Sequence, residues 1–347
     1  MKQVYLYPIT GRNIHSQTNP YLDDFMNSVS NGFRFVNRSQ PSKSGLFDIL
    51  KYLGRTEIVI FHWPENMVEK NFGLFQGIFF FLLIPYLKLR KTKIIYVVHN
   101  KISHSNNHYL LKELIAKTLI RFGDLMITHS KDGVDFINSL GKGEENVFYF
   151  PHPLKDERPF PKVNKDIDIL IWGNIAPYKG IHVFLEKLKG SELLKGLRIV
   201  IAGRVSSAEY LEELKKLKSP NVEMIYDYLD DEKLKLIISR SRMVLFPYSP
   251  ESVLSSGAFA KSVVYPLEII GPDCGSFSDF SYLDHVNTFT DPDEMIRSVE
   301  AGIVNSNSNK YQATDSIIDN YSWENFGKKL MAITGRHDLK AALQTDY

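Results

Sequence analysis

Two basic side chains follow strand-like runs near the middle of the chain. The run Ile167–Trp172 is rich in β-branched and aromatic residues and ends in a glycine turn, after which Lys179 opens a helical pattern. The run Leu197–Ala202 also ends in glycine, and Arg204 follows it directly. The carboxyl ends of strands in a parallel α/β sheet expose backbone amides to ligands. Cations at these places therefore predict a site for a phosphorylated ligand.

A third loop of the same kind lies further along the chain. It begins at Pro247-Tyr248 and reaches Ser255-Ser256-Gly257 at the start of a helical pattern. A diphosphate suits two cations and a helix start, because the cations neutralise it and the backbone N–H groups and helix dipole add to its binding. A single lysine at a helix start is more commonly a solvated side chain. Three such loops on βα turns of one sheet favour the diphosphate site.

Length and composition predict two soluble domains. The chain has 347 residues, with 44% hydrophobic and 24% charged residues, and this length exceeds the usual size of one core. A single cysteine, Cys274, excludes an intramolecular disulfide and suits a reducing compartment. No signal-peptide pattern precedes the first strand-like run, so we expect a cytoplasmic protein.

Strand and helix patterns alternate in both halves of the chain, with a helix expected around Leu46–Leu53, for example, and this alternation predicts an α/β fold with parallel sheets. We expect a first Rossmann-like domain over residues 1–155 and a second over 156–320, with the polar, proline-containing stretch Lys155–Lys165 as the linker. Through Lys155 the chain has 19 Lys and Arg against 12 Asp and Glu (+7), and the remainder has 23 against 28 (−5). A basic first half suits anionic lipid or an acidic substrate, or consists of scattered solvated charges.

The most apolar segment runs from Phe72 to Leu89 and contains Gln76 and Pro85. It is shorter than the roughly 20 residues that span a bilayer, and it lies between two strand patterns. Two interpretations remain: a buried helix of the sheet, or a helix that also touches a membrane surface, with four basic residues behind it. These basic residues are Lys88, Arg90, Lys91 and Lys93.

Several other chemistries lack their sequence patterns. The three-glycine dinucleotide fingerprint and the Walker lysine loop are absent. His99, His104 and His108 lie close in sequence without the acids or cysteines that would complete a metal site. No basic stripe with interleaved aromatic residues suggests nucleic-acid binding.

Over nearly its whole length the chain resembles GT-B-type glycosyltransferases, in particular the large retaining, sugar-nucleotide-dependent group (glycosyl transferases group 1, family 4-like). The resemblance rests on motifs that occur in both halves in the family's order. They are Asn19-Pro20-Tyr21, His62-Trp63-Pro64-Glu65, Val97-Val98-His99-Asn100, Ile127-Thr128-His129-Ser130, Trp172-Gly173 with Tyr178-Lys179-Gly180, Ala202-Gly203-Arg204, Phe246-Pro247-Tyr248 with Ser256-Gly257, Ile270-Gly271-Pro272 with Gly275-Ser276-Phe277, and Tyr321-Ser322-Trp323-Glu324.

The resemblance implies two Rossmann-like domains that face each other across a cleft, with a helical segment, residues 321–347, packing back on the N-terminal domain. It implies a catalytic set of His99, Lys179 and Arg204. It implies donor contacts from Gly173, Asn174, Lys179, Arg204, Tyr248, Ser255, Ser256 and Gly257. On the acceptor side it implies Arg12, Asn13, Asn19, Tyr21, Asn100 and His104. No metal and no cofactor are expected, and the donor substrate is expected to be a UDP- or GDP-sugar.

The expected activity is hexosyl transfer from a nucleotide-diphosphate sugar to a saccharide or lipid-linked saccharide, with retention, in surface polysaccharide or glycolipid synthesis. Cleavage of the glycosyl–phosphate bond puts negative charge on the β-phosphate, so cations and amides there lower the barrier. The departing phosphate itself can take the acceptor's proton, and His99 is expected to orient or polarise the sugar. A peripheral contact with the inner membrane leaflet fits the basic first half and the Phe72–Leu89 segment.

Two departures from the family pattern keep alternatives open. Asn174 stands where many relatives have an arginine five residues before the lysine, and Lys261 stands near the place of a ribose-binding glutamate. A catalytically degenerate nucleotide-sugar-binding or assembly protein is therefore the main alternative. A sugar-nucleotide 2-epimerase is a second, but it would need carboxylates poised for elimination, and the sequence places none well.

Overall fold

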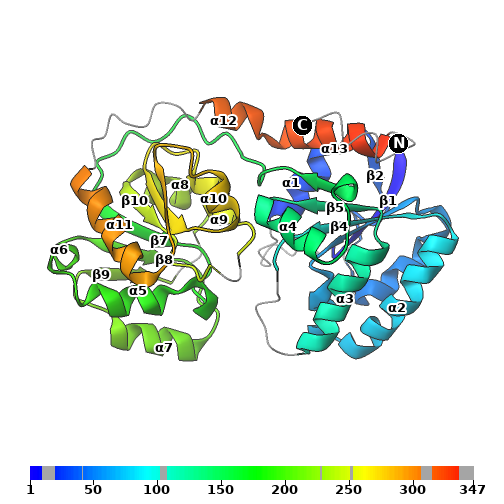
Figure 1. Cartoon of the computed structure of the whole chain (residues 1–347), viewed down its shortest axis with the longest axis horizontal. Coiled ribbons are helices and arrows are strands. Elements are labelled where there is room, and N and C mark those ends of the chain that lie inside the picture. Colours follow the sequence, from blue (N-terminus) through cyan, green and yellow to red (C-terminus); the bar gives the residue numbers. More distant parts are fainter. Residues whose placement is uncertain are drawn as a thin grey trace. The chain divides into compact units, whose positions relative to one another are not determined.

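A computed structural model of the chain describes residues 1–9, 20–40, 42–101, 108–226, 229–250, 253–305 and 315–335. The chain divides into two compact units. The first comprises Met1–Pro151 together with the segment from Trp323 onward, and the second comprises His152–Ser322. Each unit has its own parallel sheet with helices on both faces (Figure 1). The two parallel α/β sheets confirm the predicted fold class.

The first unit is built on a six-stranded sheet in the order β2-β1-β3-β4-β5-β6. All five neighbouring pairs are parallel. The strands are buried on both faces, which explains their continuous apolar sequences. Their bounds are β1 (Lys2–Tyr7), β2 (Phe33–Phe35), β3 (Ile58–His62), β4 (Lys93–Val98), β5 (Leu125–Thr128) and β6 (Val147–Tyr149).

Helices connect these strands and cover the sheet. They are α1 (Pro20–Ser28), α2 (Gly73–Leu89), α3 (Tyr109–Phe122), α4 (Lys131–Ser139) and α13 (Trp323–Gly335), with the 3₁₀ helices η1 (Gly45–Lys51), η2 (Leu53–Arg55), η3 (Pro64–Glu69) and η4 (Glu144–Asn146). Helix α13 comes from the C-terminal part of the chain and packs on α1, with Phe326 and Phe25 in ring contact at 5.7 Å.

The segment expected as a helix around Leu46–Leu53 forms the 3₁₀ helices η1 and η2 instead. The carboxylate of Asp48 accepts hydrogen bonds from the backbone N–H groups of Lys43 and Ser44, at 2.8 and 2.9 Å. The backbone N–H of Leu46 donates to Gln76 Oε1 at 2.8 Å. Because side chains satisfy these amides, the segment forms tight 3₁₀ turns without a full α-helix.

The second unit has a six-stranded parallel sheet in the order β12-β11-β10-β7-β8-β9. Its central strands β10, β7 and β8 are therefore direct neighbours, and the loops after them meet at one edge of the sheet. The bounds are β7 (Ile167–Trp172), β8 (Ile199–Ala202), β9 (Val222–Ile225), β10 (Ser241–Leu245), β11 (Glu268–Pro272) and β12 (Val286–Phe289).

The helices of the second unit mostly follow the predicted rhythm. They are α5 (Ile181–Leu188), α6 (Glu192–Lys195), α7 (Ala208–Leu217), α8 (Asp231–Ser239), α9 (Gly257–Ser262), α10 (Gly275–Asp279), α11 (Pro292–Asn305) and α12 (Asp315–Asn320), with the 3₁₀ helix η5 (Pro177–Lys179). β12 and the helices α6, α10, α11 and α12 were not predicted from the sequence.

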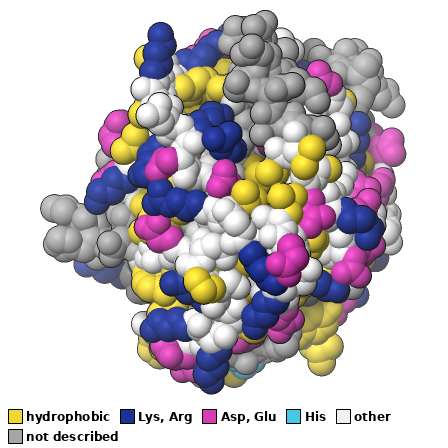
Figure 2. Space-filling view, turned by 90° about the vertical axis from the view of Figure 1, so that its left-hand side faces the viewer, with side chains coloured by type: hydrophobic (Ala, Val, Ile, Leu, Met, Phe, Trp, Pro, Cys, Tyr) yellow, Lys and Arg dark blue, Asp and Glu magenta, His cyan; other side chains and the backbone are white. Residues whose placement is uncertain are grey.

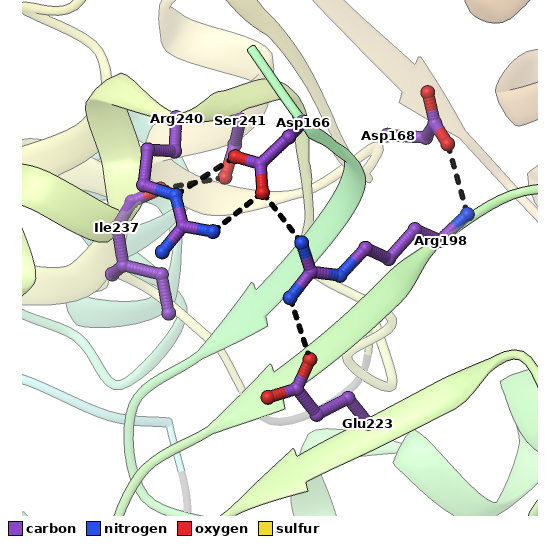
Figure 3. A network of polar contacts seen from close by, with 7 residues as sticks. All are labelled: Asp166, Asp168, Arg198, Glu223, Ile237, Arg240 and Ser241. Carbon is purple, nitrogen blue, oxygen red and sulfur yellow. Dashed lines mark hydrogen bonds and ion pairs between the residues drawn. The ribbon is translucent and has the colours of Figure 1, made fainter. Parts of the chain in front are cut away.

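An exposed ion network joins the strand starts of this sheet (Figure 3). The Arg198 guanidinium pairs with Asp166, which precedes β7, and with Glu223 of β9 at 2.8 Å. Arg240, which precedes β10, also pairs with Asp166. These cations all have carboxylate partners at the amino ends of the strands, which is the edge opposite the loops with Lys179 and Arg204. They therefore serve the sheet and not a ligand at the carboxyl ends.

Helix α2 is the predicted apolar segment, and it is buried on one face, as the first interpretation predicted; its contact with a membrane stays a prediction. One face is buried, with Phe80, Leu83 and Ile84 packed into the first unit, while Leu74, Phe75 and Ile78 are exposed. In the part of the chain that the structure describes, no helix has both the length and the hydropathy that crossing a membrane requires.

Candidate functional site

Two glycines shape the loops after β7 and β8. Gly173 has φ 116° and Gly203 has φ 148°, a region that side chains rarely adopt. A Cβ on Gly203 would lie 1.8 Å from the carbonyl oxygen of Gly173. The two loops can therefore run side by side only with glycine at this position. Their pairing continues past the strands, since Ile175 and Val205 form a further parallel bridge.

The loop after β7 leads through η5 to the start of α5. Gly180 stands at the N-cap of α5 with φ 64°, and a Cβ there would lie 1.9 Å from the carbonyl oxygen of Pro247. This close approach brings the loop after β10 against the start of α5. As a result the Lys179 Nζ lies 3.6 Å from the centre of the Tyr248 ring and 5.0 Å from that of Tyr178.

Lys179 is a partly buried cation in contact with two aromatic rings. Burial lowers its pKa to about 8, and the neighbouring Tyr178 hydroxyl opposes part of this effect. Among the residues described, no carboxylate forms an ion pair with Lys179. A cation that is desolvated without a counter-charge is typical of a ligand site, because an anionic ligand would restore the missing interaction.

Arg204 supplies a second cation on the neighbouring loop. Its carbonyl oxygen accepts a hydrogen bond from the backbone N–H of Ile175 at 2.8 Å. Arg204 therefore lies beside Asn174, which is the position where the family pattern has an arginine. The side chains of Arg204 and Asn174 are exposed, and within the described ranges Arg204 has no carboxylate partner.

The loop after β10 provides Tyr248 and the start of α9. The hydroxyl of Ser256 caps α9 by accepting a hydrogen bond from the backbone N–H of Phe259 at 3.3 Å, and it lies 3.4 Å from the Tyr248 hydroxyl. Ser256 is buried, whereas Ser255 is partly exposed and Gly257 is exposed. The hydroxyl of Ser256 thus serves as the helix cap. The residues here that a ligand can reach are Ser255 and Gly257.

His152 is a residue that the sequence analysis did not select. A Cβ built on Gly257 would lie 3.8 Å from the Nε2 of His152, so the imidazole lies beside the start of α9. Its Nδ1 lies 3.0 Å from the carbonyl oxygen of Pro153, and burial lowers its pKa to about 4. The flanking prolines of Pro151-His152-Pro153 were the available sequence signal, since they fix the backbone on both sides of the histidine.

In the first unit, three histidines lie at or directly after the carboxyl ends of neighbouring strands. They are His62 of β3, His99 after β4 and His129 after β5, and all three are buried. His62 Nδ1 and His99 Nε2 are 3.1 Å apart. The Trp63 ring stacks on the His99 ring with centroids 4.0 Å apart and an interplanar angle of 16°. His99 is therefore held from two sides.

Tyr21 completes this cluster from α1. The His129 Nδ1 lies 2.8 Å from the carbonyl oxygen of Phe150, which can only accept, so Nδ1 carries the proton. The Nε2 of His129 is then an acceptor, and the Tyr21 hydroxyl donates to it at 2.6 Å. Burial raises the pKa of Tyr21 well above its usual value. Tyr21, predicted on the acceptor side, is thus a buried member of the histidine cluster.

His62 is uncharged in this cluster. Burial, with a smaller contribution from His129, lowers its pKa to about 3. Its Nε2 has no hydrogen-bond partner among the residues that the structure describes. The remaining acceptor-side residues are placed only in part. Asn100 follows β4 and is partly buried, while Arg12, Asn13, Asn19 and His104 lie outside the described residues.

No protein-family model and no curated protein matches this sequence. Solved structures resemble the chain in fold. Anabaena Alr3699/HepE in complex with UDP-glucose aligns with a TM-score of 0.73 and 10% identity over 96% of this chain and 99% of that one. Sucrose-phosphate synthase from Thermosynechococcus elongatus aligns with a TM-score of 0.69 and 10% identity over 96% of this chain and 98% of that one. AviGT4, a glycosyltransferase involved in avilamycin A biosynthesis, aligns with a TM-score of 0.59 and 16% identity over 99% of this chain and 98% of that one.

These likenesses extend over almost the entire chain and include both units. Together with the two six-stranded parallel sheets, they show that the chain has the GT-B glycosyltransferase fold, as its sequence motifs predicted. At this level of identity the likeness concerns the fold. The function therefore has to be argued from the side chains at the strand ends.

Proposed function

We propose that the protein is a glycosyltransferase that uses a nucleotide-diphosphate sugar as donor. The observation that carries this proposal is the pair Lys179 and Arg204, which lie on the neighbouring loops after β7 and β8 without carboxylate partners among the described residues. By contrast, Arg198 at the other end of β8 pairs with two carboxylates.

The chemistry of the donor matches these groups. When the glycosyl–phosphate bond breaks, negative charge develops on the β-phosphate, and preorganised cations stabilise that charge more than they stabilise the intact donor. Lys179 is preorganised by the rings of Tyr178 and Tyr248. Arg204 adds a second positive charge with several N–H donors. The backbone N–H groups of Gly257, which is exposed, and of Ser255, which is partly exposed, are proposed as further donors.

The structures with a similar fold support a uridine nucleotide as the first ligand to test. Anabaena Alr3699/HepE is described in complex with UDP and with UDP-glucose. We propose a UDP- or GDP-sugar as the donor of this protein.

For the first unit we propose an acceptor role. His99, held by His62 and Trp63, is proposed to orient the transferred sugar and not to abstract a proton, since the departing phosphate can accept the acceptor's proton. Transfer with retention to a saccharide or lipid-linked saccharide, in the synthesis of a surface polysaccharide or glycolipid, is part of this proposal, as are a cytoplasmic location and independence from a metal.

The direct experiment measures release of the nucleoside diphosphate from UDP- and GDP-sugars, with and without saccharide acceptors. We expect turnover with one donor, and a loss well over tenfold in Lys179→Ala, because removal of one group that stabilises the developing charge costs about 2–4 kcal/mol. Unchanged turnover in this variant would contradict the diphosphate assignment.

The same experiment separates the two alternatives. Nucleoside diphosphate binding without any transfer or donor hydrolysis would favour a degenerate binding protein. Asn174 and the lack of the ribose-binding glutamate are the sequence features that support this alternative. Conversion of the donor into its 2-epimer, with a free nucleoside diphosphate as intermediate, would favour an epimerase.

A further inference from the structure

An apolar surface lies open on two neighbouring helices of the first unit. We name it the α2–α3 face and define it by Phe75, Ile78, Leu82 and Leu89 of α2 with Leu110 and Leu114 of α3. All six side chains are exposed, and Leu82, Leu89 and Leu110 are exposed by 68%, 84% and 79%. Scattered exposed leucines are ordinary, but six large exposed apolar side chains on two adjacent helices favour an interaction site.

Helical geometry places the α2 members of the set in one stripe. At about 100° per residue, positions 75, 78, 82 and 89 fall within roughly a quarter of the helix circumference. Residues 73–87 contain no charged side chain. The opposite side of α2 is already buried in the unit through Phe80 and Ile84. The helix is therefore apolar on its outer face as well as its inner face, and the described residues of the first unit leave the outer face exposed.

Helix α3 extends this stripe sideways. A Cβ built on Gly77 of α2 would lie 3.4 Å from Leu111 Cδ2 of α3, so the two helices are in close contact. Leu110 and Leu114 flank Leu111 and are one helical turn apart, which places both on the exposed side of α3. The surface is thus two helices wide.

A basic pocket lies at the carboxyl end of α2. It has a volume of about 370 Å³ and is lined by five cations, Lys2, Arg55, Arg90, Lys91 and Lys93, and by one carboxylate, Glu57. The Glu57 carboxylate accepts a hydrogen bond from the backbone N–H of Gln3 at 2.7 Å. Burial and the nearby Lys93 lower the pKa of Lys2, as expected where positive charge is in excess. The pocket therefore favours an anion.

We propose that the α2–α3 face docks on an anionic lipid bilayer, with the apolar side chains at the acyl boundary and the basic pocket on headgroup phosphates. An anionic bilayer binds protein surfaces that combine apolar side chains with a cluster of cations. A second copy of the chain fits less well, because an isologous contact would bring two uncompensated basic pockets to one interface. By contrast, the face of the molecule drawn in Figure 2 has Lys and Arg interspersed with Asp and Glu.

The position of the face relates it to the proposed function, on which this part of the inference rests. Chain order places the start of α2 after β3 and η3, so the face reaches the carboxyl edge of the sheet, where His62 and His99 lie. A lipid-linked saccharide in the bilayer would present its sugar at that edge. The proposal thereby favours a lipid-linked acceptor over a free saccharide.

The test is co-sedimentation of the full chain with vesicles of phosphatidylcholine alone and of phosphatidylcholine with phosphatidylglycerol. We expect binding to the anionic vesicles at least tenfold tighter than to the neutral ones, and weaker binding at high salt. The triple variant F75S/I78S/L82S should bind anionic vesicles at least tenfold more weakly. The variant R90E/K91E should bind at least fivefold more weakly and lose most of the salt dependence.

Matched controls lie on the second unit, where Leu193 and Leu236 are exposed by 43% and 44%. The variants L193S/L236S and K215E/K216E should bind vesicles like the wild type. The proposal is overturned if the wild type binds neither vesicle, if F75S/I78S/L82S binds like the wild type, or if light scattering shows a dimer that this variant makes monomeric. A melting-temperature shift with UDP reports the donor site separately, so its absence contradicts the proposed function and leaves the vesicle result standing.

Discussion

The ammonium group of Lys179 lies 3.6 Å from the centre of the Tyr248 ring, so the loops after β7 and β10 share one cation–π contact. The contact depends on Gly180, which lets the carbonyl of Pro247 approach the start of α5. It holds a cation where burial disfavours its charge. An anionic ligand would be stabilised by the positive charge of Lys179. The ligand-free protein gains no such interaction from this charge.

The first prediction concerns the ring of Tyr248. Tyr248→Leu should weaken UDP binding about threefold or more, because a cation–π contact contributes about 0.5–2 kcal/mol. Tyr248→Phe keeps the ring and removes only the hydroxyl, which lies 3.4 Å from Ser256 Oγ, so it should bind UDP within about twofold of the wild type. Calorimetric titration measures both. Equal loss in the two variants would assign the effect to the hydroxyl instead.

The second prediction concerns pH. The pKa of Lys179 is lowered to about 8, so its charge is lost as the pH rises through that value. UDP affinity should therefore fall between about pH 7 and pH 9, with proton uptake on binding near pH 8. Lys179→Arg keeps its charge throughout this range and should show a flatter pH profile. The same slope in both proteins would exclude Lys179 as the titrating group.

The third prediction separates function from stability. A partly buried ammonium without a carboxylate partner among the described residues destabilises the folded chain, so Lys179→Met should raise the melting temperature of the ligand-free protein while UDP binding is lost. The sign follows from the linkage relation: between the lowered pKa of about 8 and the ordinary value of 10.5 the unfolded chain binds more protons, so wild-type stability should rise with pH there. A lower melting temperature in Lys179→Met would indicate a structural lysine.

The fourth prediction compares the two ends of β8. Arg204→Ala should weaken UDP binding about tenfold, since a charged hydrogen bond contributes about 1.5–3 kcal/mol. Arg198→Ala removes an arginine that pairs with Asp166 and Glu223 at the opposite edge, and it should leave UDP binding unchanged. If both variants bind UDP like the wild type, Arg204 does not take the place of the family's arginine at Asn174.

The fifth prediction concerns the backbone. Gly180→Ala forces a Cβ to within 1.9 Å of the Pro247 carbonyl oxygen at φ 64°, and it should destabilise the protein by about 2–4 kcal/mol. Gly54→Ala has no atom within 4 Å of the new Cβ and should change stability by less than about 1 kcal/mol. Denaturant unfolding of the two variants measures the difference. Similar stability of both variants would contradict the close approach of the two loops.

The sheets could be predicted from the sequence because buried parallel strands leave continuous apolar runs, as in Ile167–Trp172. The order of the loops could be predicted as well, since Lys179, Arg204 and Tyr248 all follow such runs. β12 and the helix α11 were not predicted. A helix was predicted around Leu46–Leu53, but the segment forms 3₁₀ helices, and the side chains of Asp48 and Gln76 accept hydrogen bonds from its backbone amides.

The details of the site depend on contacts between residues far apart in sequence, which periodicity does not report. His62 meets His99 through strand pairing and side-chain orientation, and Lys179 meets Tyr248 through a glycine contact. His152 lies beside Gly257, 105 positions later in the chain. The hydroxyl of Tyr21, which was predicted on the acceptor side, donates to His129, a contact that the sequence did not indicate.

The most direct test of the central claim is calorimetric titration of UDP, GDP and uridine into the wild type and Lys179→Ala at neutral pH. One diphosphate should bind the wild type, uridine should bind far more weakly, and Lys179→Ala should lose more than tenfold in affinity for the diphosphate. Diphosphate binding of equal strength in the two proteins would contradict the account.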